Sequence, residues 1–539
     1  MTKTFKSLLW MMLISFNVIA QTAPFEVYIE PLNISGLAGL QAFAWGQHNG
    51  KILAIGGRKD GLHARQPFAA FDVPGHNTNL IVIDPVAMQS WSAPLASLPT
   101  AMQEQLSSTN MQFYQEGDYL YVAGGYGYSA TSADHITYPN LTAIKVPDVI
   151  NAVINANAFT SYFRQITDTM FALTGGYFNK IYNTFYLTGG QKFIGRYNPM
   201  GPNNGPGFIQ VYSNAIRKFV INDNGINLTI SHLPSIIDTN NLHRRDYNVA
   251  PQIMPNGQEG LTAFSGVFQK NVDLPFLNCV NIDSNGYNVN NAFSQYYNHY
   301  HCAHIPLFSA SANEMHTVFF GGIAQYLDSV GILVQDNNVP FVKTIARVTR
   351  TSTGVMSEYK LPVEMPAYLG AGSEFIPIES LPHYANEVIK LDDLIADTTL
   401  AGYIYGGINS TAPNIFFTNN GTQSTASSQL FKVFIIKKST VGFDQLNVQS
   451  TGSLKMMVSP NPNDGDFTIN YSLKSNTDVK ITIHTQEGKL KEVITLKNQS
   501  SGDHQYVKSM DNKYQTSAYI ITLETAHEKV TQKMMLNID

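Results

Sequence analysis

Charged residues are scarce in this sequence. Only 14% of its 539 residues are charged, against about 25% in a typical globular domain, and the net charge is −5 at pH 7. Lysine and arginine form no basic patch, so the composition argues against a nucleic-acid partner. The chain has instead 40 glycines, 28 tyrosines and 30 phenylalanines. This mixture is typical of β-sheet with tight turns.

Long apolar runs are also missing beyond the N-terminus. Lys3 and Lys6 precede an apolar stretch over 8–19, and Val18-Ile19-Ala20 forms a plausible cleavage site. The stretch is too short for a membrane span, so we predict a secretory signal peptide at 1–20 and no transmembrane segment. The alternative is an uncleaved anchor. Residue 21 is Gln rather than Cys, which argues against lipoprotein processing.

Cysteine is almost absent, with Cys279 and Cys302 as the two examples. An even number of cysteines in an exported protein favours a disulfide, and we predict a Cys279–Cys302 bond. The alternative is two unpaired, buried thiols.

Short apolar runs that end in glycine repeat along the chain. The last glycine of each run stands at 57, 125, 190, 266, 322 and 407, as in "KILAIGG", "YLYVAGG" and "HTVFFGG". Each run follows another strand pattern and a polar turn, and a third strand pattern comes after it. A fourth is visible in places. Four short antiparallel strands per repeat predict the blades of a β-propeller.

These units resemble kelch repeats, in which an apolar strand ends in Gly-Gly and a further strand of the "IDPVAMQSW" type follows. Trp91 matches the kelch tryptophan in the first repeat. The resemblance implies an all-β, six-bladed kelch-type β-propeller over 21–440, and seven blades is the alternative. The segment "FEVYIEPLN" at 25–33 is expected to supply the fourth strand of the last blade.

The C-terminal region has a different character. After an expected linker at 441–455, residues 456–539 alternate between strand patterns and turns, which predicts a small β-sandwich. Pro460, Asn461, Pro462, Gly465, Gly488 and Lys533 resemble the type A C-terminal sorting domain of the type IX secretion system of Bacteroidota. Ala518 departs from that pattern, where the family usually has glycine. The resemblance implies the secretion machinery as a partner, and a secreted or outer-surface location.

Polar loops at the expected mouth of the propeller channel form the candidate ligand site. Its arginines predict bidentate binding of carboxylates, as in an acidic sugar. The alternative is a structural set of Arg–Asp pairs between blades. The candidate residues are Arg58, His63, Arg65, Tyr126, Lys192, Arg196, His243, Arg244, Arg245, Asp246, His299 and His301.

The stretch "NHYHCAH" at 298–304 raises the question of a metal ion in the channel. On a strand, His299 and His301 would share one face, while Cys302 and His304 would share the other. Zinc sites have three or four protein ligands, so two histidines on one face, His299 and His301, are weak candidates for a metal site. The alternative is a set of hydrogen-bonded structural histidines. We predict no other cofactor than this candidate metal ion in the propeller channel.

No catalytic motif accompanies these features, since G-x-S-x-G, H-E-x-x-H and phosphate-binding loops are all missing from the sequence. We therefore expect a non-catalytic extracellular protein that binds glycan or protein. The alternative is a carbohydrate-active propeller enzyme. Kelch propellers include a sugar mutarotase and the copper enzyme galactose oxidase, so the resemblance implies a mutarotase-like or, with less support, a galactose oxidase-like enzyme. A third class is an adhesion or matrix protein of the cell surface.

Overall fold

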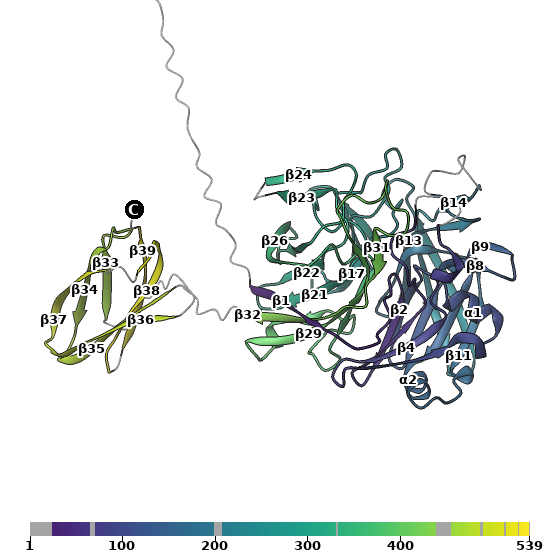
Figure 1. Ribbon diagram of the computed structural model, residues 1–539. Coiled ribbons are helices and arrows are strands. Elements are labelled where there is room, and N and C mark those ends of the chain that lie inside the picture. The colour runs from purple at the N-terminus through teal and green to yellow at the C-terminus, as the bar shows by residue number, and fades with distance from the viewer. Residues whose placement is uncertain are drawn as a thin grey trace, which may run out of the picture. The chain divides into compact units, whose positions relative to one another are not determined.

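The structure is a computed structural model that describes residues 24–64, 70–198, 207–329, 332–437, 454–485, 489–510, 514–526 and 528–537. The chain divides into two compact units, Met1–Lys438 and Ser439–Asp539, which we describe separately (Figure 1). The expected signal peptide, Arg65, Gly488 and residues 441–453 of the expected linker lie outside the described residues. Within the described ranges, no helix combines the length and apolar character that a membrane crossing needs.

The described residues of the first unit form six sheets that each have four principal antiparallel strands. The first three sheets contain β2 (Ala44–His48), β3 (Lys51–Ile55), β4 (Asn79–Asp84) and β5 (Gln89–Pro94); β6 (Gln112–Glu116), β7 (Tyr119–Ala123), β10 (Asn140–Lys145) and β11 (Phe163–Thr167); and β12 (Thr174–Ile181), β13 (Thr184–Ile194), β15 (Ala215–Asp223) and β16 (Leu228–Ile237). The last three contain β17 (Asn248–Ile253), β18 (Glu259–Phe264), β19 (Cys279–Asp283) and β20 (Gly286–Asn290); β21 (His304–Ser309), β22 (Glu314–Phe320), β25 (Thr344–Arg350) and β26 (Met356–Glu364); and β27 (Ser373–Pro377), β29 (Thr398–Gly406), β32 (Leu430–Lys437) and β1 (Phe25–Leu32).

Short strands, helices and turns connect or extend these sheets. They are the hairpin β8 (Tyr126–Ser129) and β9 (Asp134–Thr137), β14 (Ile209–Tyr212), the hairpins β23 (Tyr326–Ser329)–β24 (Ile332–Gln335) and β30 (Ile408–Ser410)–β31 (Ser424–Ala426), β28 (Ile389–Lys390), the helices α1 (Thr100–Leu106) and α2 (Val146–Ile154), and 3₁₀ turns at Val73–Gly75, Leu95–Ser97, Thr160–Tyr162, Thr169–Phe171 and Leu391–Asp393. β9 and β14 both pair with β13, and β28 pairs in parallel with β21. The all-β prediction is confirmed, and the sheets are consistent with a β-propeller-like fold.

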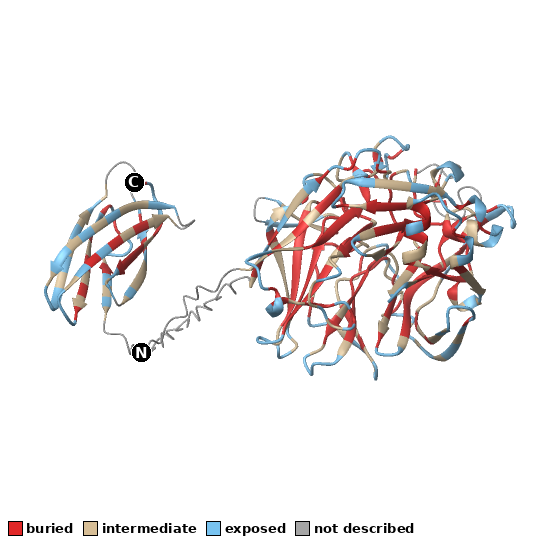
Figure 2. Cartoon of the chain, turned by 90° about the horizontal axis from the view of Figure 1, so that it is seen from below, coloured by how far each residue is buried: buried red, intermediate tan, exposed pale blue. Residues whose placement is uncertain are grey.

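Burial explains the sequence pattern of each sheet. The second strand is apolar along most of its length because neighbouring sheets cover both of its faces, as in β3, where Ile52 to Ile55 are all buried. The fourth strand reads as half-polar because one face meets solvent; β5 has no buried residue. Figure 2 shows the buried residues concentrated on the strands of this unit.

The glycine pairs mark where the second strand approaches its neighbours. Gly56 and Gly57 directly follow β3 with φ of +64° and +78°, a left-handed region that favours glycine. A Cβ on Gly57 would lie 2.6 Å from the carbonyl oxygen of Gln41. The glycines repeat along the sequence because the backbone at the end of each second strand lies too close to its neighbours for a larger residue.

β1 completes the last sheet from the other end of the unit. It pairs antiparallel with β32 from Phe25↔Lys437 to Leu32↔Leu430. Phe25 and Val27 are buried in the same apolar cluster as Val433 and Ile435. The expected role of 25–33 as the fourth strand of this sheet is thus found in the structure.

The expected disulfide is wrong, because Cys279 and Cys302 are both free and buried. The Cys279 thiol lies 3.7 Å from the sulfur of Met356, and Cys302 Sγ accepts a weak hydrogen bond from Asn248 Nδ2 at 3.7 Å. Burial raises the pKa of each thiol to about 12. Both cysteines serve as small apolar core residues, which is the alternative that the sequence left open.

The second unit contains two sheets that share one apolar cluster. The sheets are β33 (Lys455–Ser459), β34 (Asp466–Leu473) and β37 (Gly502–Ser509), and β36 (Leu490–Gln499), β35 (Thr477–Thr485), β38 (Ser517–Glu524) and β39 (Lys529–Leu536). Asn461 joins the Pro460–Pro462 turn to β39, since its Nδ2 donates to Lys533 O at 2.8 Å and its Oδ1 accepts from Met535 N at 2.8 Å. Gly465 follows with φ of +119°. These contacts give the turn a structural role.

Opposite faces of β1 provide a test of its contribution. Val27 is 7% exposed and faces the cluster, whereas its neighbour Tyr28 is 49% exposed. We expect Val27→Asp to lower the free energy of unfolding of the first unit by about 3 kcal/mol, because a carboxylate enters an apolar core. Tyr28→Asp, the matched control, should cost less than about 1 kcal/mol. Urea unfolding of the full chain measures both, and equal losses would contradict this role for β1.

Candidate functional site

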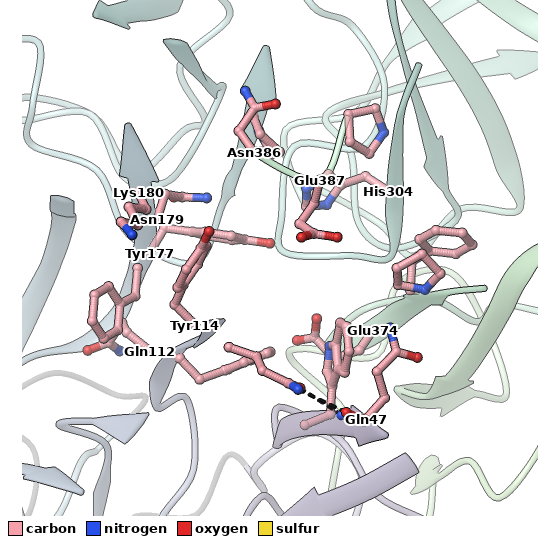
Figure 3. Close-up of a pocket in the computed structure, with 18 of the residues that line it drawn as sticks. Gln47, Gln112, Tyr114, Tyr177, Asn179, Lys180, His304, Glu374, Asn386 and Glu387 are labelled. Carbon is pink, nitrogen blue, oxygen red and sulfur yellow. Dashed lines mark hydrogen bonds between the residues drawn. The ribbon is translucent and has the colours of Figure 1, made fainter. Parts of the chain in front are cut away.

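A cavity of about 410 Å³ lies where the first strands of all six sheets meet. Each of these strands contributes to its wall: Trp45 from β2, Tyr114 from β6, Tyr177 from β12, Pro251 from β17, Pro306 from β21 and Phe375 from β27. Since one strand from every sheet reaches it, the cavity lies on the common axis of the sheets. We call it the channel pocket, and Figure 3 shows it in close-up.

One wall of the channel pocket comes from the segment 378–390, which we call the bridge segment. It leaves β27 and ends in β28, which pairs with β21. Within it Asn386 Nδ2 donates to Gln252 O on β17 at 3.0 Å, and Glu379 Oε2 accepts from Gly50 N at 2.6 Å. His383, Asn386 and Glu387 all line the pocket. The bridge segment is therefore tied to three other sheets and presents its side chains from a fixed backbone.

An ion pair lies in the wall of the pocket. His301 Nε2 is 2.7 Å from Glu374 Oε1, and Glu374 is only 6% exposed. Burial by itself lowers the pKa of His301, but the Glu374 carboxylate outweighs burial and raises that pKa above its ordinary value. Burial and then Glu374 raise the pKa of the adjacent Tyr177 phenol. An imidazole whose pKa is raised by a paired carboxylate therefore faces the cavity.

His304 lies on the same wall, but burial shifts its pKa in the opposite direction to that of His301. Burial lowers the pKa of His304 to about 4, so its ring is neutral near pH 7. The expected alternation along "NHYHCAH" is wrong, because β21 begins only at His304 and the residues before it are not extended in one strand. His301 and His304 consequently share the pocket, while His299 does not.

Both ring nitrogens of His299 form hydrogen bonds with the backbone. The ring is fully buried, with Nε2 2.8 Å from Gln295 O and Nδ1 accepting from Gln325 N at 3.0 Å. Burial lowers the pKa of His299 to about 4. In the described ranges, no group of three or more His, Cys, Asp or Glu side chains is placed to hold a metal ion. The residues present therefore do not fit the metal site, copper included, that the sequence raised for His299 and His301.

Three arginines of the expected ligand site are paired with aspartates. Arg58, only 2% exposed, forms an ion pair with Asp60 and donates to Asp72 O at 3.0 Å. Arg196 forms an ion pair with Asp72. The remaining pair joins Arg245 to Asp246, and Asp246 in turn raises the pKa of Arg245 although burial opposes it.

Arg244 is buried, and none of the carboxylates in the described ranges forms an ion pair with it. Its guanidinium donates to the carbonyl oxygens of Asn241 at 2.6 Å, Ser265 at 2.6 Å and Asn278 at 2.9 Å, and it lies 4.0 Å from the centre of the Phe276 ring. Burial lowers the pKa of Arg244 to about 10. With the three ion pairs above, these contacts match the structural alternative for the arginines of the expected site that the structure describes.

The other expected residues also have structural contacts. His63 packs between Phe71 and Tyr197, and burial lowers its pKa to about 4. Tyr126 donates to Gly195 O at 2.8 Å, and His243 stacks on Tyr212 with ring centres 3.7 Å apart. Lys192 is half-buried on β13. Among the expected residues that the structure describes, His301 is the one that lines the channel pocket.

The pocket contains buried oxygen atoms that have no hydrogen-bond partner. They are Gln112 Oε1, Asn179 Oδ1 and Asn386 Oδ1, on side chains that are 2%, 7% and 5% exposed. These oxygen atoms have almost no accessible surface, so they lie within the wall and not on the open surface of the cavity, and bound water is the usual partner of such buried acceptors. Sequence analysis missed these residues and both pocket tyrosines. No local signal marks them, since Gln112 and Tyr114 lie within β6 and Tyr177 and Asn179 lie within β12.

Comparisons with known proteins add little to this geometry. No protein-family model matches the chain, and no curated protein does. Among solved structures, "Structure of YjhT" is 10% identical with a TM-score of 0.39 and covers 75% of this chain and all of that one. A fungal alcohol oxidase of the AA5 family in complex with copper is 9% identical with a TM-score of 0.37, covering 96% of this chain and all of that one. A Bacillus subtilis glycoside hydrolase family 43 arabinoxylan arabinofuranohydrolase in complex with cellotetraose is 10% identical with a TM-score of 0.26, covering 92% and 96%. Likenesses this weak carry no argument about ligand or chemistry.

The buried arginine makes a prediction about stability. We expect Arg244→Met to lower the free energy of unfolding by at least about 2 kcal/mol, because several buried carbonyl oxygens lose their donor. Lys59→Met, on an exposed side chain next to Arg58, should stay within about 0.5 kcal/mol of wild type. Chemical unfolding of the full chain measures both. An Arg244→Met protein of wild-type stability would reopen a ligand-binding role for this arginine.

The His301–Glu374 pair makes a prediction about pH. Because the pKa of His301 is raised in the folded protein, the pair's stabilising contribution is full below about pH 6.5, the ordinary value for histidine. It should be lost as the pH rises through the raised pKa of His301. We therefore expect the difference in unfolding free energy between wild type and Glu374→Gln to shrink as the pH increases from about 6 to about 9. Glu30→Gln, whose partner is Lys432, should show a difference that stays flat over this range; the same flat line for Glu374→Gln would contradict the assignment.

Proposed function

We propose that the first unit is a six-bladed kelch-type β-propeller that binds glycan in its channel pocket outside the cell and does not catalyse a reaction. Six four-stranded sheets whose first strands line one cavity support six blades rather than seven. The pairing of β1 with β32 supports a ring that closes with strands from both ends of the unit. The proposed domain spans 21–440.

The proposed location is the cell exterior. The signal peptide expected at 1–20 supports export, and the motif residues around Pro460 and Lys533 support type IX sorting by residues 456–539 after a linker at 441–455. Two sheets with a common apolar cluster support a small β-sandwich for this region. The secretion machinery would then be its partner, and the tail would carry routing rather than ligand binding.

The composition of the channel pocket is the observation that carries the glycan assignment. Trp45, Tyr114 and Tyr177 supply aromatic surface, on which the apolar faces of sugar rings pack. Polar side chains, among them Lys180 and Glu379, share the lining and can hydrogen-bond to hydroxyl groups. An aromatic wall beside polar side chains suits a sugar, which has an apolar ring face and hydroxyl groups.

A carbohydrate-active enzyme is the second candidate, and the His301–Glu374 pair favours it. An imidazole with a raised pKa in contact with a buried carboxylate has the composition of a general acid–base pair. Turnover of a bound sugar, followed by NMR, would identify an enzyme if Glu374→Gln abolished it and left binding intact. Unchanged sugar spectra with wild-type protein would favour the binding protein.

Two tyrosines test where the glycan binds. Tyr177 lines the channel pocket, whereas Tyr212 stacks on His243 and accepts a hydrogen bond from Arg245, away from the pocket. A glycan array followed by calorimetry on the full chain would identify a ligand. We expect Tyr177→Ala to weaken its binding by about tenfold or more, since a stacking contact is lost, and Tyr212→Ala to leave it unchanged. The reverse pattern would place the site among the arginines, and the lack of any glycan ligand would contradict the function.

A further inference from the structure

We propose that the glycan ligand is an oligosaccharide whose chain runs from the channel pocket outward, between the sheet that contains β2 and the sheet that contains β27. This inference deepens the proposed function and rests on it. It is carried by a second cavity of about 400 Å³, which we call the side pocket. The place of the side pocket in the fold, its lining and its junction with the channel pocket all favour a ligand longer than one sugar ring.

The side pocket lies one strand farther from the common axis than the channel pocket. Two cross-strand pairs line it: Gln47 with Ile52, on β2 and β3, and Ile376 with Tyr403, on β27 and β29. The channel pocket is lined by the first strands of all six sheets, whereas the side pocket is lined by first and second strands of two neighbouring sheets. A ligand that fills both cavities therefore extends outward from the axis.

The two cavities adjoin at three lining residues that they share, namely Gln47, Pro377 and Glu379. A hydrogen bond from Gly50 N to Glu379 Oε2 at 2.6 Å ties the turn after β2 to the bridge segment at this junction. The backbone of Gln47 is held as well, since its N donates to Gln115 Oε1 at 2.7 Å and its O accepts from Gln115 Nε2 at 2.8 Å. The junction between the cavities thus has a fixed backbone on both sides.

The lining of the side pocket combines an apolar floor with a polar rim. Ile52, Ile376 and Tyr403 are buried in one apolar cluster and form the floor. Asn49 and Ser380 are exposed and form part of the rim, so their side chains are open to a ligand. A sugar ring has an apolar face and hydroxyl groups at its edge, and it can therefore contact both parts of this lining.

The sizes of the two cavities favour several rings over one. At about 410 Å³ and 400 Å³, each cavity by itself falls within the range of roughly 300–1,000 Å³ that is usual for small-molecule sites. A monosaccharide in the channel pocket would leave the side pocket to water. An oligosaccharide would cover the apolar floor of the side pocket as well, and burial of that surface is favourable. Affinity should therefore increase with the length of the saccharide.

A series of saccharide lengths tests the inference with the full chain. The probes are glucose, galactose, mannose, xylose and N-acetylglucosamine, each compared with its β-1,4-linked trimer and pentamer. We expect calorimetry to show that the pentamer binds more tightly than the shortest ligand of the same sugar by about tenfold or more, because the outer units add a second contact surface. Tyr177→Ala should weaken binding at every length, since every ligand occupies the channel pocket.

Ser380 offers a way to fill the side pocket alone, because it is exposed and lines that cavity but not the channel pocket. We expect Ser380→Trp to reduce the affinity for the pentamer to that for the shortest ligand, since the indole occupies the space of the outer units. Binding of the shortest ligand should stay unchanged, which also shows that the variant is folded. Ser352→Trp, the same change at an exposed serine outside the lining of both cavities, should alter neither affinity.

The outcomes separate this inference from the proposed function. Equal affinity at every length, lost in Tyr177→Ala, would overturn the outward path and keep the glycan site. A gain with length that Ser380→Trp leaves intact would also overturn it, because the outer units would then lie elsewhere. Pentamer binding that falls in Ser380→Trp but not in Tyr177→Ala would place the glycan outside the channel pocket and overturn both. The lack of any bound saccharide, in this series and on the array, would likewise overturn both.

Discussion

The antiparallel ladder between β1 and β32 is the interaction on which the first unit depends. It joins residues 25–32 to residues 430–437, so it closes a loop of about four hundred residues with backbone hydrogen bonds and the burial of Phe25 and Val27. Closing so long a loop costs entropy, but the cost rises only slowly with length. Because β27, the first strand of that sheet, forms part of the channel pocket, the geometry of the pocket depends on a ladder three strands away from it.

Hydrogen-bond satisfaction separates structure from function in this molecule. The arginines look like ligand-binding groups in the sequence, yet each described one in the expected site has an aspartate or a set of carbonyl oxygens as its partner. The pocket amides look unremarkable in the sequence, yet their oxygens are buried without a partner. A paired buried charge stabilises the fold, while an unpaired buried acceptor costs free energy until something binds to it. The candidate site is identified by the cavity where the first strands of the six sheets meet.

Different parts of the structure were accessible to sequence analysis to different degrees. Strands and their grouping could be predicted because Gly56–Gly57 and its counterparts mark close backbone contacts that only glycine tolerates. The partners of Arg58 and Arg196 could not, since Asp60 and Asp72 reach them only through the path of a loop. Alternation along "NHYHCAH" failed because β21 starts later than the pattern suggested. The pocket residues come from six distant strands, and no local pattern brings Gln112, Asn179 and Asn386 together.

The bridge segment has a consequence for how such a protein can change. It belongs to no principal strand of the six sheets. It is held by the short β28 ladder and by the side chains of Asn386, which donates to Gln252 O, and Glu379, which accepts from Gly50 N. His383 and Glu387 of this segment line the cavity, whereas Leu381, Val388 and Ile389 pack in the core. Substitutions of His383 and Glu387 can therefore alter the charge and shape of the pocket without repacking a sheet. In this architecture the scaffold and the selectivity can be inherited separately, with a few pocket-facing residues free to diverge while the core of the same segment stays constrained.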